Sequence, residues 1–184
     1  MNEQEYSNGF DEILQMDIKQ VPYNDTSYLE YTKLNKSRFN RWIKTGVLLQ
    51  QNILQLKNIN KQQNWVLITE HWCGDAAHIV PFIIKLAAIN PLINLEIQLR
   101  DSNSEIENYL TNGGKSIPIL IIRDENKKDI VVWGPRPKEC QFLYLEMKKD
   151  NIELNEQKIQ LQNWYNHDNG VSIQNEICAL LPLA

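Results

Sequence analysis

Cys73 stands where a short apolar run of the chain changes directly into a helical pattern. Residues 65–69 predict a β-strand, and the residues from 76 onward predict a helix that contains Pro81. A thiol at the start of a helix lies at the positive end of the helix dipole, which favours the reactive thiolate. The placement therefore predicts a nucleophilic thiol with a lowered pKa at Cys73.

Charged neighbours would pull the pKa of this thiol in opposite directions. The carboxylate of Asp75 disfavours a second anion close by, whereas a protonated His71 or His78 would favour the thiolate. The alternative interpretation treats Cys73 as a small, partly buried hydrophobic residue without reactivity. A metal site is also suggested by four possible ligands, Glu70, His71, Asp75 and His78. Their spacing matches no standard ligand set, so we expect no metal.

The other two cysteines, Cys140 and Cys178, are far from Cys73 in the sequence. An odd cysteine count without a C-x-x-C pair argues against a zinc site or a disulfide framework. Cys140 can resolve a mixed disulfide on Cys73 only if their Cα atoms come within ~7 Å. We favour a buried helix position for Cys140 and a packing role for Cys178.

Composition excludes several classes of protein. The chain has 184 residues, of which 42% are hydrophobic, and this predicts one domain with a real core. The net charge of -4 gives no reason to expect nucleic acid, and no apolar run approaches the ~20 residues of a membrane span. The polar, acidic N-terminus is unlike a secretory signal, so we expect a cytoplasmic location.

A basic stripe near the N-terminus leaves two interpretations open. It would suit a nucleic-acid or membrane surface, but we favour a solvated helix face because acidic residues elsewhere outweigh it. The stripe consists of Lys33, Lys36, Arg38, Arg41 and Lys44.

Strand and helix patterns alternate through the middle of the chain and predict a mixed sheet with helices on both faces. We expect strands at 65–69, 92–100, 117–123 and 129–133, with a turn at 125–128, and helices at 76–90, 103–111 and 137–150.

Helices are also expected at both ends of the chain. The N-terminal pattern uses Phe10, Ile13, Leu14 and Ile18 and ends at Val21-Pro22. Asp25 offers N-cap chemistry for a helix over 28–45, and a further helix is expected within 47–59. A short helix closes at Asn169-Gly170, and the amphipathic tail 171–181 either covers the core or forms a subunit contact.

Four features resemble the thioredoxin superfamily, and more closely its small bacterial thioredoxin-like proteins of uncharacterised function. WCGDA at residues 72–76 resembles the W-C-G-P-C loop. Pro81 matches the proline in the helix that follows that loop, and Ile117-Pro118 resembles the cis-proline loop. Gly134 matches the glycine at the active-site rim.

The resemblance covers residues 60–150 and implies an α/β thioredoxin-like fold, a central mixed sheet flanked by helices with an N-terminal helical extension. We expect residues 61–150 to form the thioredoxin-like domain and 1–60 to pack on it as a helical extension. Residues 151–184 are expected to be a C-terminal helical segment of the same domain.

Departures from the family pattern limit the chemistry. Ala76 replaces the second cysteine, Asp75 replaces the proline, and Leu67 replaces the buried carboxylate. A dithiol cycle within the motif is therefore excluded. The remaining redox prediction is monothiol exchange, in which Cys73 attacks a disulfide and glutathione or a protein thiol resolves the product.

Two other functions stay open at this point: a non-catalytic module that binds a peptide or protein, and a glutathione-dependent transferase or peroxidase, although no glutathione site is identifiable. We expect no bound cofactor. The sequence gives no oligomeric state.

The rim around the thiol is expected to be polar and acidic, from Glu70, His71 and Asp75, with Trp72 and Gly74 next to the sulfur. A cis Pro118 would leave the backbone of Ile117 free to pair with an extended ligand. Arg136, between two prolines, either clamps a carboxylate or phosphate or pairs with Asp75 or Glu70. We favour the pairing.

Overall fold

A four-stranded mixed sheet forms the centre of the molecule in the computed structural model, which describes residues 1–16 and 20–182. The strand order is β2-β1-β3-β4. β1 (Gln63–Thr69) pairs in parallel with β2 (Ile93–Leu99) and antiparallel with β3 (Ile119–Arg123). β4 (Asp129–Trp133) pairs antiparallel with β3. The predicted fold class and the four predicted strands are confirmed.

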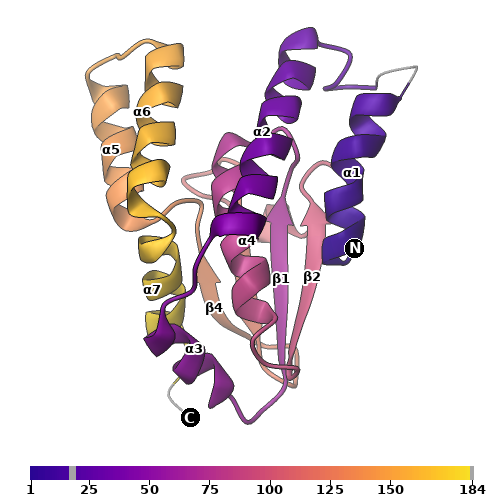
Figure 1. Ribbon diagram of the computed structural model, residues 1–184, viewed down its shortest axis with the longest axis vertical. Coiled ribbons are helices and arrows are strands. Elements are labelled where there is room, and N and C mark those ends of the chain that lie inside the picture. The colour runs from indigo at the N-terminus through magenta and orange to yellow at the C-terminus, as the bar shows by residue number, and fades with distance from the viewer. Residues whose placement is uncertain (17–19, 183–184) are drawn as a thin grey trace.

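The crossover between the two parallel strands is α4 (Gly74–Ala87), which contains Pro81. Almost every residue of α4 is buried because α2 (Thr26–Thr45) lies across its outer side (Figure 1). Asp25 caps α2 as predicted, its side chain accepting a hydrogen bond from the Ser27 amide. The helix that carries the cysteine loop is thus held between the sheet and an N-terminal helix.

The remaining N-terminal helices pack at the edges of this arrangement. α1 (Glu3–Gln15) begins with a capping box at Asn2 and Glu5 and lies against α2 and β2. α3 (Gln50–Lys57) contacts α7 (Val171–Leu180). The predicted use of Ile18 in the first helix lies outside the described residues. The division of the chain at residues 60 and 150 stays a prediction.

The C-terminal third forms a helical arm that returns to the core. α5 (Lys138–Lys149) and α6 (Leu154–Asp168) pack as a hairpin beside the main body (Figure 1). Asn169 and Gly170 then adopt left-handed conformations, and a Cβ on Gly170 would lie 2.2 Å from the Phe82 ring. α7 follows with Ile173 and Ile177 fully buried, so the tail covers the core.

One predicted helix is wrong. Instead of a helix over residues 103–111 the chain forms a single 3-10 turn, η1 (Ile106–Asn108). Ser and Asn side chains in this stretch favour turns by bonding to nearby backbone groups, and Asn103 takes a positive φ of 58°. Ile106 is the buried residue of η1, which leaves no apolar stripe to hold a longer helix.

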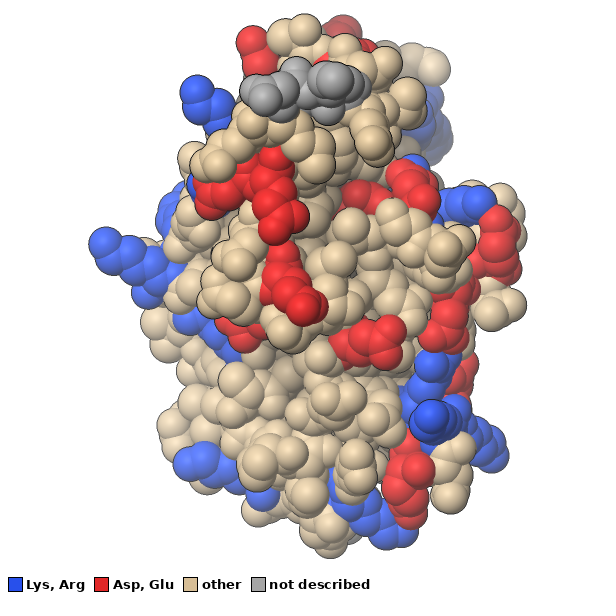
Figure 2. All heavy atoms as spheres, turned by 90° about the vertical axis from the view of Figure 1, so that its right-hand side faces the viewer, with Lys and Arg blue, Asp and Glu red and all other residues tan. Residues whose placement is uncertain are grey.

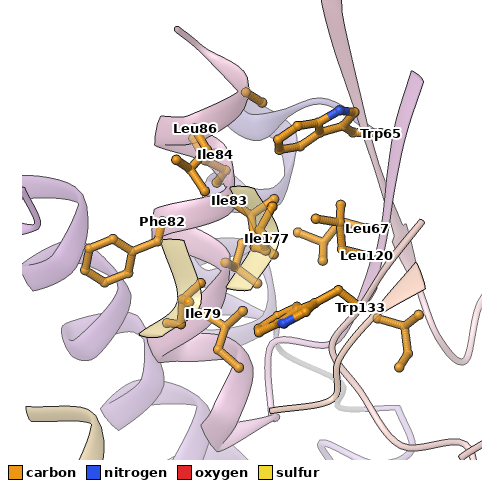
Figure 3. Close-up of a cluster of buried hydrophobic side chains, with 14 of the residues drawn as sticks. Trp65, Leu67, Ile79, Phe82, Ile83, Ile84, Leu86, Leu120, Trp133 and Ile177 are labelled. Carbon is orange, nitrogen blue, oxygen red and sulfur yellow. The ribbon is translucent and has the colours of Figure 1, made fainter. Parts of the chain in front are cut away.

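The core lies between the sheet and α4. In Figure 3 Trp65, Leu67 and Leu120 from the sheet face Ile79 and Ile83 from α4. Leu67 is completely buried, and its burial contributes about 2 kcal/mol. This position resembles the one where the family carries a carboxylate. Because Leu67 is apolar, it supplies no proton acceptor there. No helix in the described residues is long and apolar enough to span a membrane.

Candidate functional site

Cys73 occupies the N-cap position of α4, at the end of the turn that follows β1. The strand-to-helix placement predicted from the sequence is therefore correct. Its side chain is 7% exposed, and Sγ lies 3.5 Å from the carbonyl oxygen of Ile117. The thiol is enclosed between the start of the helix and the loop before Pro118.

The predicted fall in the pKa of this thiol is wrong. Burial, and then the charge of Asp75, raise the pKa of Cys73 to about 12. Amides of Ala76 and Asp75 and the guanidinium of Arg136 favour the thiolate, but they do not offset burial. Loss of hydration therefore outweighs the helix terminus, and the thiol is protonated at neutral pH.

Neither neighbouring histidine compensates. His71 Nε2 donates to the carbonyl of Tyr6 at 2.9 Å, and burial lowers the pKa of His71 to about 4. His78 Nδ1 accepts from Trp42 Nε1 at 2.9 Å, and its Nε2 lies 3.2 Å from Gln162 Oε1. Burial and nearby Arg38 lower the pKa of His78 to about 3. Both imidazoles are neutral at pH 7.

Asp75 and Arg136 form the buried ion pair of the site. Arg136 Nη2 lies 2.7 Å from Asp75 Oδ2, with both side chains largely buried, and Tyr165 Oη donates to Asp75 Oδ1 at 2.9 Å. The guanidinium also lies 4.1 Å from the centre of the Tyr144 ring. The favoured interpretation of Arg136, a structural pairing with Asp75, is confirmed.

Backbone geometry fixes the opposite rim. The Ile117-Pro118 and Gly134-Pro135 bonds are both cis. Gly134 has φ of +125°, and a Cβ there would lie 2.3 Å from the Pro118 carbonyl oxygen, so only glycine allows this contact. In the described part of the chain the Ile117 amide donates no hydrogen bond. The Ile117 carbonyl accepts a hydrogen bond from the Cys73 thiol, so among the described residues the predicted free backbone holds for the amide alone.

Trp72 is half-buried and lines the pocket beside Cys73. Arg100 stacks 4.6 Å from its ring centre, and Tyr28 packs edge-on against it. Two positions later, a Cβ on Gly74 would lie 2.6 Å from Tyr31 Oη. The start of α4 is therefore closed by α2, which is why Cys73 is buried.

A pocket of about 690 Å³ opens beside Cys73, between α2, the cysteine loop and the α5–α6 hairpin. Its lining includes Trp72, Cys73, Gly74, Asp75 and Ile117. The predicted acidic rim is wrong in part, because Glu70 and His71 are buried behind the loop and do not line this pocket. Arg38, Arg100, Lys115, Arg136 and Lys158 make the lining basic.

Comparison with known proteins identifies the family to which this chain belongs. A family model described as thioredoxin matches residues 22–162. The chain belongs to the thioredoxin family. The match runs from just before α2 into α6, beyond the 60–150 over which we drew the resemblance, and it includes every lining residue of the pocket except Tyr165.

Solved structures agree on the fold of this thioredoxin family member. A protein of unknown function, PA1234, from Pseudomonas aeruginosa is 14% identical, with a TM-score of 0.57, 93% of this chain and 89% of that one covered. An HIV epitope-scaffold is 15% identical, also with a TM-score of 0.57, with 84% and 89% covered. No curated protein sequence matched the chain.

The other cysteines of this thioredoxin family member are buried free thiols. Cys140 lies fully buried in α5, as favoured from the sequence, and burial raises its pKa to about 12. Cys178 packs in α7, and burial raises its pKa to about 11. Among the described residues, no three His, Cys, Asp or Glu side chains are grouped to hold a metal ion.

Several pocket residues were missed from the sequence. The sequence indicated only that Tyr31 and Tyr165 lie in helices. It gave no clear pattern for the segment that contains Lys158. Arg38 was included in the basic stripe assigned to a solvated face, but it lines the pocket. These residues place charges and aromatic rings on two helices that are far apart in the chain. That they form one pocket is evident only once the two helices are packed together.

Proposed function

We propose that this thioredoxin-family chain is a non-catalytic binding module that holds an extended peptide in the pocket beside Cys73. The observation that carries this proposal is the coexistence of a large open pocket with a protonated thiol. The pocket volume of about 690 Å³ lies within the ~300–1,000 Å³ typical of ligand sites. The pKa of Cys73, raised to about 12, disfavours its use as a nucleophile.

Backbone pairing explains why the occupant is a peptide. The Ile117 amide has no partner among the described residues and precedes a cis proline at the start of β3. An extended chain can accept a hydrogen bond from this amide, while its side chains contact Trp72 and the α5–α6 hairpin. In this role Cys73 contributes shape and packing.

Selection from a random peptide display library tests this function. The pocket-filling variant is Ser116→Trp, because Ser116 lines the pocket and its side chain makes no hydrogen bond to the described residues that the substitution would remove. The matched control is Ser37→Trp, an exposed position on α2 outside the pocket. We expect peptides enriched on the wild type and on Ser37→Trp to be lost on Ser116→Trp. Enrichment that survives Ser116→Trp, or none on the wild type, would overturn the proposal.

Monothiol exchange is the second candidate, because the amides of Ala76 and Asp75 in the first turn of α4 act to lower the pKa of Cys73 and so favour its thiolate. In that reaction the Cys73 thiolate attacks the glutathione sulfur of a protein–glutathione mixed disulfide, forms a Cys73–glutathione disulfide and releases the protein thiolate; a glutathione thiolate then frees the Cys73 thiolate and forms glutathione disulfide. Incubation with glutathione disulfide and mass mapping tests it, with Cys73→Ala as control. A Cys73 adduct that forms faster than one on Cys140 or Cys178 supports catalysis, and equal or no labelling excludes it.

A further inference from the structure

Charge in this molecule is unevenly distributed, and the pocket carries positive charge although the chain has a net charge of -4. Five cationic side chains line the pocket, and Asp75 is the one carboxylate among its described lining residues. Figure 2 shows acidic side chains gathered instead on the face where α1 and β2 lie. An anionic ligand would therefore be drawn to the pocket and away from the opposite side.

Three of the five cations already have carboxylate partners. Arg136 pairs with Asp75, Arg100 with Asp101, and Lys115 with Glu107. Within the described residues, Arg38 and Lys158 form no ion pair with a carboxylate. These two side chains are the charges of the pocket left for a ligand.

Arg38 and Lys158 come from different helices and approach the same aromatic ring. The Arg38 guanidinium lies 5.2 Å from the centre of the Tyr31 ring, and the Lys158 ammonium lies 5.1 Å from it. Arg38 donates one hydrogen bond to Asn35 Oδ1. Two like charges at one ring repel each other, and an anion between α2 and α6 would relieve that repulsion while gaining charge-assisted hydrogen bonds.

Resting on the proposed function, we infer that the pocket selects acidic peptides, with ligand carboxylates bound by Arg38 and Lys158. The Ile117 amide then fixes the peptide backbone beside Cys73. Leu145, Leu154 and Leu161 of the hairpin line the same pocket and contact the apolar side chains between the acidic residues. A peptide that alternates acidic and aliphatic residues presents both kinds of contact.

Fluorescence anisotropy with the labelled peptide (Glu-Val)₃ tests this inference, with (Gln-Val)₃ and (Lys-Val)₃ as comparison probes. We expect (Glu-Val)₃ to bind most tightly and to weaken at high salt. Arg38→Gln and Lys158→Gln should each weaken its binding by about tenfold, the effect of losing a hydrogen bond to a charged group. The matched controls are Lys33→Gln and Lys44→Gln, which remove the same charge from exposed positions of α2 outside the pocket.

The outcomes separate the inference from the proposed function. If (Gln-Val)₃ binds as tightly as (Glu-Val)₃, or if the control variants weaken binding equally, acidic selection is overturned while a peptide-binding pocket stands. Displacement of (Glu-Val)₃ by equimolar inorganic phosphate would mean a simple anion site and would overturn the peptide assignment. No binding of any probe overturns the acidic preference, and the display selection then decides the function separately. Lys158→Glu, at an exposed position, repeats the test if Arg38→Gln does not fold.

Discussion

Two carboxylates flank Cys73, and the fold surrounds them in opposite ways. Asp75, on the pocket side, is paired with Arg136 and accepts a hydrogen bond from Tyr165. Glu70, on the side of β2 and α1, is 5% exposed and accepts a hydrogen bond from the Asp101 amide at 2.9 Å. No ion pair of the described residues includes Glu70. Burial raises the pKa of Glu70 to about 7.

The difference lies in what distant segments supply. Gly134-Pro135 and Pro137 hold Arg136 on a stiff loop that reaches Asp75, and α6 adds Tyr165. The Glu70 side receives α1 instead, whose Tyr6 ring stacks on the His71 imidazole. Of the two buried carboxylates beside the thiol, the one with an ion-pair partner is therefore the one that a distant loop supplies with a cation.

Breaking the paired side should give the largest effect. Arg136→Met leaves the buried Asp75 without its cation, so we expect the free energy of unfolding to fall by about 3–5 kcal/mol. Urea denaturation followed by circular dichroism measures it. Lys115→Met is the matched control because its pair with Glu107 is exposed and contributes at most about 1 kcal/mol. Equal losses in the two variants would contradict the contrast.

The unpaired side predicts a pH dependence. The pKa of Glu70 is about 7 in the folded protein and 4.5 in its reference state, so its contribution to stability is fully present below pH 4.5 and is lost as pH rises toward 7. The loss is on the order of 3 kcal/mol. Glu70→Gln should remove this part of the pH dependence while still accepting the Asp101 hydrogen bond.

The histidines also make stability depend on pH, so the informative quantity is the difference in unfolding free energy between the wild type and Glu70→Gln. The pKa values of His71 and His78 are lowered to about 4 and 3, so their contribution is present above pH 6.5 and is lost as pH falls. Both histidines are kept in Glu70→Gln. Subtracting the two curves of unfolding free energy against pH isolates Glu70, and parallel curves between pH 4.5 and 7 would refute its raised pKa.

Local signals carried much of what the sequence predicted correctly. An apolar run before Cys73, the helix after it and the proline at 118 are readable within a few residues, and they placed the thiol and its facing loop. The Asp75–Arg136 pair was also accessible, because prolines on both sides of Arg136 limit where its side chain can reach.

Burial was not accessible in the same way. The helix start alone predicts a lowered thiol pKa, but Tyr31 from α2 closes over Gly74 and Tyr165 from α6 lies on Asp75. These helices lie far before and after the loop in the chain. The sign of the pKa shift therefore depends on tertiary packing, as does the meeting of Arg38 with Lys158 at one ring.

The smallest expected effect concerns how Asp75 acts on the thiol. Asp75→Asn removes the neighbouring negative charge and leaves Arg136 facing the sulfur, so both changes favour the thiolate. We expect the pKa of Cys73 to fall by roughly one unit, about 1.4 kcal/mol, measured by thiolate absorbance in a Cys140→Ala/Cys178→Ala background. Asp11→Asn, on α1 away from the site, is the control.

Because burial is the largest cause of the raised pKa, the value in Asp75→Asn should stay above the ~8.5 of a free thiol. A fall below ~8.5 would mean that one carboxylate, rather than enclosure by α2 and α6, silences Cys73. The substitution of proline by aspartate would then be the switch between a catalytic and a binding site. If the pKa of Cys73 stays above ~8.5 in Asp75→Asn, enclosure by α2 and α6 is what keeps the thiol protonated. The raised pKa and the pocket then have the same structural cause, the packing of these two helices.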